Sequence, residues 1–328
     1  SYDNNDVGFR LLSLLIMAGA SMLAAGVPDI FADGQSVIVV LGYAVMRLGM
    51  VGLWLRAAAA NPAGRRAALT YAVGITAVQL VWVARLGVPD HWLVITFFAC
   101  VALELAIPVV AESIGGSSTF HPRHIAERYG LLAIIALGEA VFGTVASVAA
   151  LVEDQGWSLE AALVVFAGVG ITFGLWWTYF IMPSGVVLAR HRSRGFVWGY
   201  GHILIYAAIA ATGAGLHVVA FVIEGHTDIG TVGAIVAIAV PVLVFSVVNF
   251  ALYAYLVRQW DSLHALLFAG TVLTLVLAVA LAAAGASLGV CLVIVTLSPA
   301  VVVVGFETVG HRHQAASLER ALEEPTAP

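Results

Sequence analysis

The sequence predicts an all-α fold, a polytopic bundle of about ten transmembrane helices. Hydrophobic residues make up 62% of the 328 residues, charged residues make up 10%, and the mean hydropathy is +1.02. Soluble domains carry about 25% charged residues, so this composition excludes an ordinary soluble domain. Cys100 and Cys291 lie within apolar runs, where we expect small core residues and neither a disulfide nor a metal site.

The first four expected spans alternate with short connections. We place these spans at about residues 8–27, 37–55, 68–86 and 92–111, each near the 20 residues that a helix needs to cross a bilayer. The connections read PDIFADG, RAAAANPAGRR and VPDH, and their Pro, Gly, Asp and Asn residues favour turns. The pattern therefore predicts four successive membrane helices.

Six further spans follow the polar stretch ESIGGSSTFHPRH. We place them at about residues 129–152, 159–181, 196–222, 230–257, 263–284 and 288–306. The connections EDQGWS, PSGVVLARHRSR, EGHTD, RQWD and AGAS are again short. After the last span, SLERALEE predicts one or two exposed helical turns.

The fourth and tenth spans share a faint repeat. Cys100 precedes Pro108 by eight residues, and Cys291 precedes Pro299 by eight residues. Either the match is chance, or the chain holds four spans of one six-helix unit and all of a second, parallel one. The predicted domains are a four-span unit at 1–111, a six-helix unit at 112–306 and a cytoplasmic tail at 307–328.

The arginines predict the orientation of the chain. All 14 basic residues are arginine; Arg47 lies inside a span, Arg85 lies on one side of the membrane, and the other twelve lie on the opposite side. Cytoplasmic loops carry the excess of Arg and Lys. We therefore expect both ends of this chain to be cytoplasmic.

Three ionisable residues lie deep in the expected spans, namely Arg47, Glu104 and Glu139. Charges at such depth are costly and mark candidate substrate or ion paths. Arg47 and Glu104 lie about ten and twelve residues into their spans, which matches their depths within about one helical turn. We expect them to form a buried ion pair, either as a structural tie or as the lining of a path.

Glu139 lies about ten residues into the fifth span, roughly 15 Å deep and near the middle of the bilayer. It has no evident partner, so we expect it either to compete with Glu104 for Arg47 or to be protonated, since low dielectric favours the neutral acid. A protonatable carboxyl at this depth suits a proton-coupled carrier, whereas a hydrogen bond to a neighbouring helix would be structural. The preceding Gly138 permits close backbone approach.

A polar segment leads into the fifth span. His121, His124 and Glu127 recur every third residue, and Pro122 suits a first helical turn. The spacing is not a specific metal signature, so we expect no metal. We expect this segment to cap the helix at the interface, with Arg128 reaching toward lipid head groups.

Other polar and aromatic residues of the spans have structural interpretations. Trp176, Trp177 and Tyr179 are typical of an aromatic belt at the membrane interface. We expect the remaining polar side chains to form hydrogen bonds between helices: Gln79, His202, His217 and Asn249.

Residues 124–139, HIAERYGLLAIIALGE, resemble the hallmark ERFGLFxIIxLGE of the bacterial low temperature requirement A (LtrA) family. The match includes Glu127, Arg128, Gly130, Gly138 and Glu139. Three other stretches resemble the family: YDNNDVGFR at 2–10, WWTYF at 176–180 and YGHILIYAAIAATGAGL at 200–216. The resemblance covers essentially the whole chain.

The resemblance implies a protein of the bacterial cytoplasmic membrane with about twelve spans. Family members usually begin with a helix bearing an ELFFDLVFV-like motif, so we expect this chain to be a fragment whose missing acidic helix could partner Arg47. The acidic residue that often follows WWxYF is absent, and Ile181 and Met182 stand there. The family is named for a requirement in the cold, which does not specify an activity.

We expect a secondary transporter of unidentified substrate, with Glu139, Glu104 and Arg47 along its path. One alternative is an intramembrane enzyme that acts on a lipid or quinone through the segment His121–Arg128. The other is a non-catalytic membrane protein that supports growth in the cold. The expected partners are the lipid bilayer and a small molecule or ion; we expect no cofactor and no nucleic acid.

Overall fold

The computed structural model describes residues 6–115, 121–259 and 262–323, and the secondary structure in these ranges is helical without a strand. The predicted all-α class is therefore confirmed. Within these ranges, ten helices are long and apolar enough to cross a membrane, as the sequence predicts. The chain divides into two compact units, Ser1–Phe120 and His121–Pro328, each described by itself below.

The first unit contains four long helices that each pack against the next along the chain. They are α1 (Val7–Asp33), α2 (Val37–Ala60), α3 (Arg65–Ala84) and α4 (Leu93–Gly115), with short 3₁₀ turns η1 (Arg85–Gly87) and η2 (Asp90–Trp92) before α4. Side-chain oxygens define the first two helix starts, because Asp6 and Ser36 accept hydrogen bonds from backbone N–H groups three residues later.

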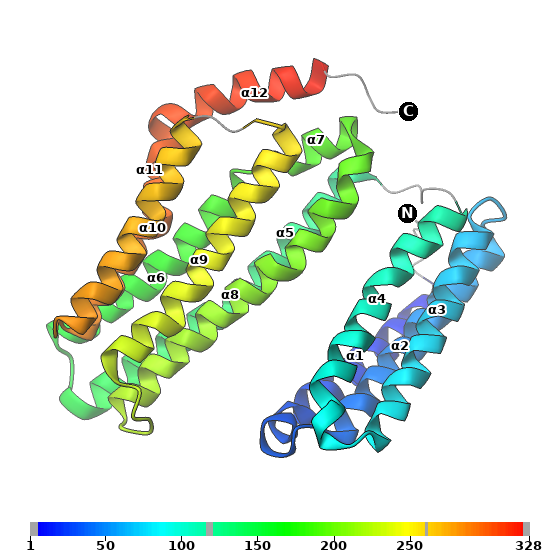
Figure 1. Cartoon of the computed structure of the whole chain (residues 1–328), viewed down its shortest axis with the longest axis horizontal. Helices are drawn as coiled ribbons and strands as arrows, with labels where there is room; N and C mark the ends of the chain where they lie inside the picture. The colour runs from blue at the N-terminus through cyan, green and yellow to red at the C-terminus, as the bar shows by residue number, and fades with distance from the viewer. Residues whose placement is uncertain (1–5, 116–120, 260–261, 324–328) are drawn as a thin grey trace. The chain divides into compact units, whose positions relative to one another are not determined.

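The described part of the second unit contains six long helices, three short elements and the helix α12; Figure 1 labels the α-helices. The long helices are α5 (Pro122–Gln155), α6 (Leu159–Phe180), α8 (Gly195–Ile223), α9 (Gly230–Val257), α10 (Ser262–Ala283) and α11 (Leu288–Gly305). The short elements are α7 (Ser184–Arg190), the 3₁₀ turn η3 (Arg192–Arg194) and the π-helical turn η4 (Phe306–Gly310), which leads into α12 (His311–Glu323).

The six long helices of this unit pack as a closed ring. Going around it, α5 contacts α8, then α9, α10, α11 and α6 follow, and α6 contacts α5 again. Fully buried apolar side chains from these helices form one cluster, among them Ile171, Leu175, Phe245 and Val295. The first unit has a much smaller buried cluster, Ile75, Val78 and Ile107. The ring therefore contains most of the core.

Polar contacts join α6 to α11, which closes the ring. At the start of α6, Glu160 Oε2 accepts from Ser287 Oγ at 2.9 Å, and Oε1 accepts from the backbone N–H of Gly289. Further along, Thr296 Oγ1 donates to the carbonyl oxygen of Ala167 at 3.2 Å. These bonds fix the register of two helices that are far apart in sequence.

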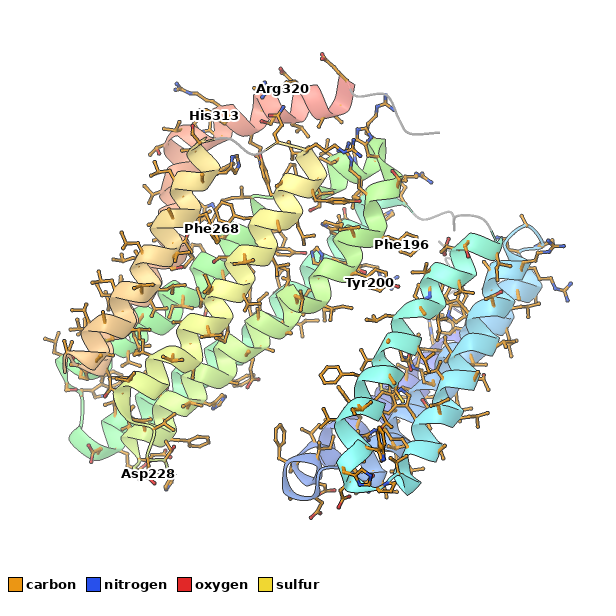
Figure 2. The ribbon with its side chains drawn as sticks, viewed as in Figure 1. Phe196, Tyr200, Asp228, Phe268, His313 and Arg320 are labelled. Carbon is orange, nitrogen blue, oxygen red and sulfur yellow. The ribbon has the colours of Figure 1, made fainter. Side chains whose placement is uncertain are left out.

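The helical turns expected after the last span belong to the helix α12. This helix packs against other elements of the second unit, whereas the sequence predicts exposed turns. Ser317 and Ala321 are each 2% exposed. The carbonyl oxygen of Ala321 lies 2.6 Å from Nε2 of His191, and Arg320 (labelled in Figure 2) donates from Nη2 to Oε1 of Gln259 at 2.7 Å. The helix is amphipathic and buries its small residues, so the tail prediction is wrong in this respect.

Helix α5 begins at Pro122, seven residues before the expected span start at Tyr129. Apolarity marks only the part of a helix that faces lipid, whereas backbone hydrogen bonds continue through the polar residues that precede it. Pro122 occupies the first turn, as the sequence predicts. The polar segment is thus part of α5 itself.

Candidate functional site

Arg47 and Glu104 form an ion pair inside the first unit, which confirms the predicted contact between the second and fourth spans. Their side chains are 15% and 13% exposed. The same Arg47 guanidinium group donates to the hydroxyl group of Tyr43, one helical turn earlier on α2. Tyr43 was not among the predicted residues, although its position four residues before Arg47 was a usable signal.

This pair leaves hydrogen-bonding capacity unused. The Nε atom of Arg47 and the Oε1 atom of Glu104 are buried and have no hydrogen-bond partner in the structure. A buried donor or acceptor without a partner costs free energy. One donor of Arg47 and one acceptor of Glu104 are therefore not used by their mutual contact.

Glu139 lies near the middle of α5, and its partner within the second unit is His217 of α8. The Oε1 atom of Glu139 and the Nε2 atom of His217 are 3.3 Å apart, and the side chains are 47% and 35% exposed. From the sequence, His217 is expected only to form hydrogen bonds between helices. This pair joins two groups that can both bind and release a proton.

Close packing of α5 against α8 positions this pair. A methyl group on Gly213 would lie 2.6 Å from the backbone carbon of Glu139, and one on Gly143 would lie 2.5 Å from the carbonyl oxygen of Gly213. Nearby, Ser147 Oγ donates to the carbonyl oxygen of Leu216 at 2.5 Å. Small residues thus let the two backbones approach each other.

Gly138 does not take part in this packing. A methyl group at Gly138 would meet nothing within 4 Å. The expectation of close backbone approach at Gly138 is wrong, because the residue lies on a different face of α5 from Gly143. Gly130 of the family motif does have a tight environment, since its methyl group would lie 3.0 Å from Cε1 of Phe180.

A buried aromatic cluster surrounds His202 in α8. Nδ1 of His202 lies 2.7 Å from the carbonyl oxygen of Trp198 and must donate to it, so Nε2 is the acceptor for the hydroxyl group of Tyr179 at 3.0 Å. Tyr179 is only 7% exposed. The interfacial-belt interpretation is wrong for this residue, because its hydroxyl group finds a partner inside the bundle.

The start of α5 is exposed. The side chains of His124 and Glu127 are 67% and 69% exposed, and Nδ1 of His124 lies 3.3 Å from Oε2 of Glu127. Arg128 is exposed as well. In the described part of the chain, no three His, Cys, Asp or Glu side chains are grouped to hold a metal ion.

Both cysteines are buried free thiols, as expected for small core residues: Cys100 is 1% exposed and Cys291 is 0% exposed. A small cavity of about 50 Å³ lies at one end of the ring between α6, α9, α10 and α11. Thr178 Oγ1 and Asn249 Oδ1 line it and have no hydrogen-bond partner in the structure. Its size suits a few water molecules.

Ten long apolar helices, with ionisable pairs inside the helical units, define a polytopic helical membrane protein. The family model of the bacterial low temperature requirement A protein (LtrA) matches residues 1–299, and the chain belongs to that family. No curated protein and no solved structure matches the chain. The motif residues Glu127–Glu139 lie along α5, whereas residues 2–5 of the YDNNDVGFR stretch lie outside the described residues.

Proposed function

We propose that this chain functions in a secondary transporter of the bacterial cytoplasmic membrane, in which Glu139 and His217 bind and release the coupling proton. The supporting observation is the placement of this pair. Glu139 lies near the middle of α5, is 47% exposed on its unit and is 3.3 Å from His217. Transporters and pumps use chains of Asp, Glu and His for proton relay.

A half-exposed carboxylate is costly at mid-membrane if it faces only lipid. The cost is reduced if the group is protonated, or if it faces water or another polar surface along a path. A path that opens to one side of the membrane at a time would let Glu139 exchange its proton with either compartment. His217 would hold the proton when Glu139 is ionised, so the proton would pass from one side chain of the pair to the other.

Arg47 and Glu104 are the proposed substrate or ion contacts of the first unit. The unused Nε of Arg47 and Oε1 of Glu104 offer one donor and one acceptor to a polar group. The exposed residues His124, Glu127 and Arg128 would then anchor α5 at the cytoplasmic surface. The excess of arginine on one side of the membrane supports this placement, and it also supports a cytoplasmic location for both ends of the chain.

The test measures charge movement after a pH jump, which requires no known substrate. The full-length protein is reconstituted in liposomes on a solid-supported membrane, and the transient current is compared with that of Glu139→Gln. We expect the variant to reduce the current about tenfold or more, since the amide cannot bind a proton. Glu153→Gln, an exposed position near the end of the same helix, is the matched control.

A wild-type current from Glu139→Gln at equal protein density would refute the proton-coupled transporter. His124→Ala separates this proposal from an interfacial enzyme. If the protein is a transporter of this kind, His124→Ala keeps the current, because His124 lies at the exposed start of α5 and Glu139 lies near the middle of that helix.

A further inference from the structure

The first unit contains a cavity of about 510 Å³ at the end where α1 leads into α2 and α3 leads into α4. This volume is within the range of about 300–1,000 Å³ typical of ligand pockets. Its walls are mainly apolar, and they include side chains that are strongly exposed, such as Val94 at 68% and Phe98 at 64%. The cavity is thus continuous with the apolar surface of the helices.

A buried cation, Arg85, lies in the wall of this cavity and is only 9% exposed. Its Nη2 atom donates to the carbonyl oxygen of Leu93 at 2.9 Å, and its guanidinium carbon lies 5.8 Å and 5.9 Å from the ring centres of Trp82 and Phe97. Among the described residues, no carboxylate forms an ion pair with it. The guanidinium charge is therefore buried without a counter-charge, which is costly.

The unused donors around Arg85 point to an anion. Nε of Arg85 and Nε1 of Trp82 are both buried, both belong to residues that line the cavity, and neither has a hydrogen-bond partner in the structure. Two N–H donors and one uncompensated positive charge match a phosphate oxygen. The apolar walls beside them match an acyl chain rather than a freely soluble anion.

We propose that this cavity binds one membrane phospholipid with an anionic head group. Its phosphate accepts hydrogen bonds from Arg85 and Trp82, and an acyl chain lies along Val94, Phe97 and Phe98. Charge complementarity and the apolar wall together select this occupant over a zwitterionic lipid, which would bring its own cation to the site. The proposal does not depend on the transporter function, because it concerns a different group of residues.

The test counts lipid molecules that stay bound to the full-length protein in native mass spectrometry. Protein stripped of lipid in detergent is titrated with phosphatidylglycerol, and separately with phosphatidylcholine. We expect one tightly bound phosphatidylglycerol in the wild type, and about tenfold weaker binding for Arg85→Gln, which loses the charge and the unused Nε donor. Arg56→Gln, which removes an arginine at the opposite end of α2, is the matched control and should bind like the wild type.

A second variant keeps Arg85 intact and fills the cavity. Val101→Phe adds volume at the wall without changing any charge, so it should weaken binding to a similar extent even if Arg85→Gln folds poorly. Glycerol phosphate, which has the head-group phosphate but no acyl chain, should not displace the lipid. Equal retention of phosphatidylcholine, unchanged binding in Val101→Phe, or displacement by glycerol phosphate would each overturn the proposal.

Discussion

The guanidinium group of Arg47 in α2 is paired with the carboxylate of Glu104 in α4, and both side chains are mostly buried. The pair joins two helices that are separated along the chain by the whole of α3. Because the opposite charges neutralise each other, the first unit can hold both in an apolar setting.

Removal of one partner of this pair should destabilise the protein more than removal of both. Arg47→Leu leaves the Glu104 charge without a partner, and breaking a buried pair typically costs about 3–5 kcal/mol. Arg47→Leu combined with Glu104→Leu should recover most of that loss, since apolar residues replace both charges. Reversible unfolding in mixed micelles measures the three free energies, and equal losses in the single and double variants would contradict the coupling.

Glu139→Gln should be present in the membrane at normal abundance and still fail to support growth in the cold. The substitution preserves the shape of the side chain and removes its proton exchange. The measurement is complementation of a deletion strain with the full-length gene, with membrane abundance quantified in parallel, and Glu153→Gln as control. Rescue at normal abundance would mean that Glu139 has a structural role.

Gly213→Ala should destabilise the second unit by about 1–3 kcal/mol, because overpacking forces backbones apart. The added methyl group would lie 2.6 Å from the backbone carbon of Glu139. Gly138→Ala is the matched control on α5, since its methyl group meets nothing within 4 Å. Thermal unfolding of the purified protein compares the two; similar melting temperatures for both variants would disprove the close contact.

The start of α1 should lose its stabilising contacts in acid. A hydrogen bond from Arg56, followed by one from the backbone N–H of Phe9, lowers the pKa of Asp6 below its ordinary value of 3.8. A lowered pKa in the folded state means that the stabilisation is present above pH 3.8 and is lost as the pH falls through the folded-state value. The protection of backbone amides at the start of α1 against hydrogen exchange, measured relative to the intrinsic exchange rate at each pH, should therefore decrease in acid.

Asp6→Asn provides the control for this effect. The amide keeps the oxygen that caps the helix but does not titrate in this range, so the loss of protection in acid should disappear. Arg56→Gln should reduce it as well, because the main cause of the lowered pKa is then removed. The same pH dependence in Asp6→Asn would assign the effect to another group.

Hydropathy alone predicted ten membrane-crossing helices, because lipid requires a continuous apolar stretch of a fixed length. Equal depths also predicted the contact of Arg47 with Glu104. Depth is a one-dimensional quantity that the sequence supplies directly. It does not specify the direction of a side chain around its helix, and this is why Gly138 and Tyr179 were assigned to the wrong surroundings.

The partner of Glu139 could not be predicted from depth, because it depends on which helices are neighbours in the bundle. His217 lies on α8, which contacts α5 directly although α6 and α7 come between these two helices along the chain. The docking of α12 was missed for a related reason. Its buried positions are Ser317 and Ala321, small residues with little hydrophobic signal, and two of its contacts are made by the backbone carbonyl groups of Ala321 and Leu322.

The closed ring has a consequence for biosynthesis. The ribosome completes α6 long before α11, its neighbour in the finished unit, and the two helices are separated by the chain from Ile181 to Ser287. At a translation rate of about 5–20 residues per second, α6 waits on the order of 5–20 s for its partner. During this interval Glu160 lacks the Ser287 and Gly289 donors that it has in the folded unit. Among the spans of the second unit, α11 is synthesised last and completes the ring, so a ribosome stalled before α11 would leave an open arc of helices for membrane quality control to recognise.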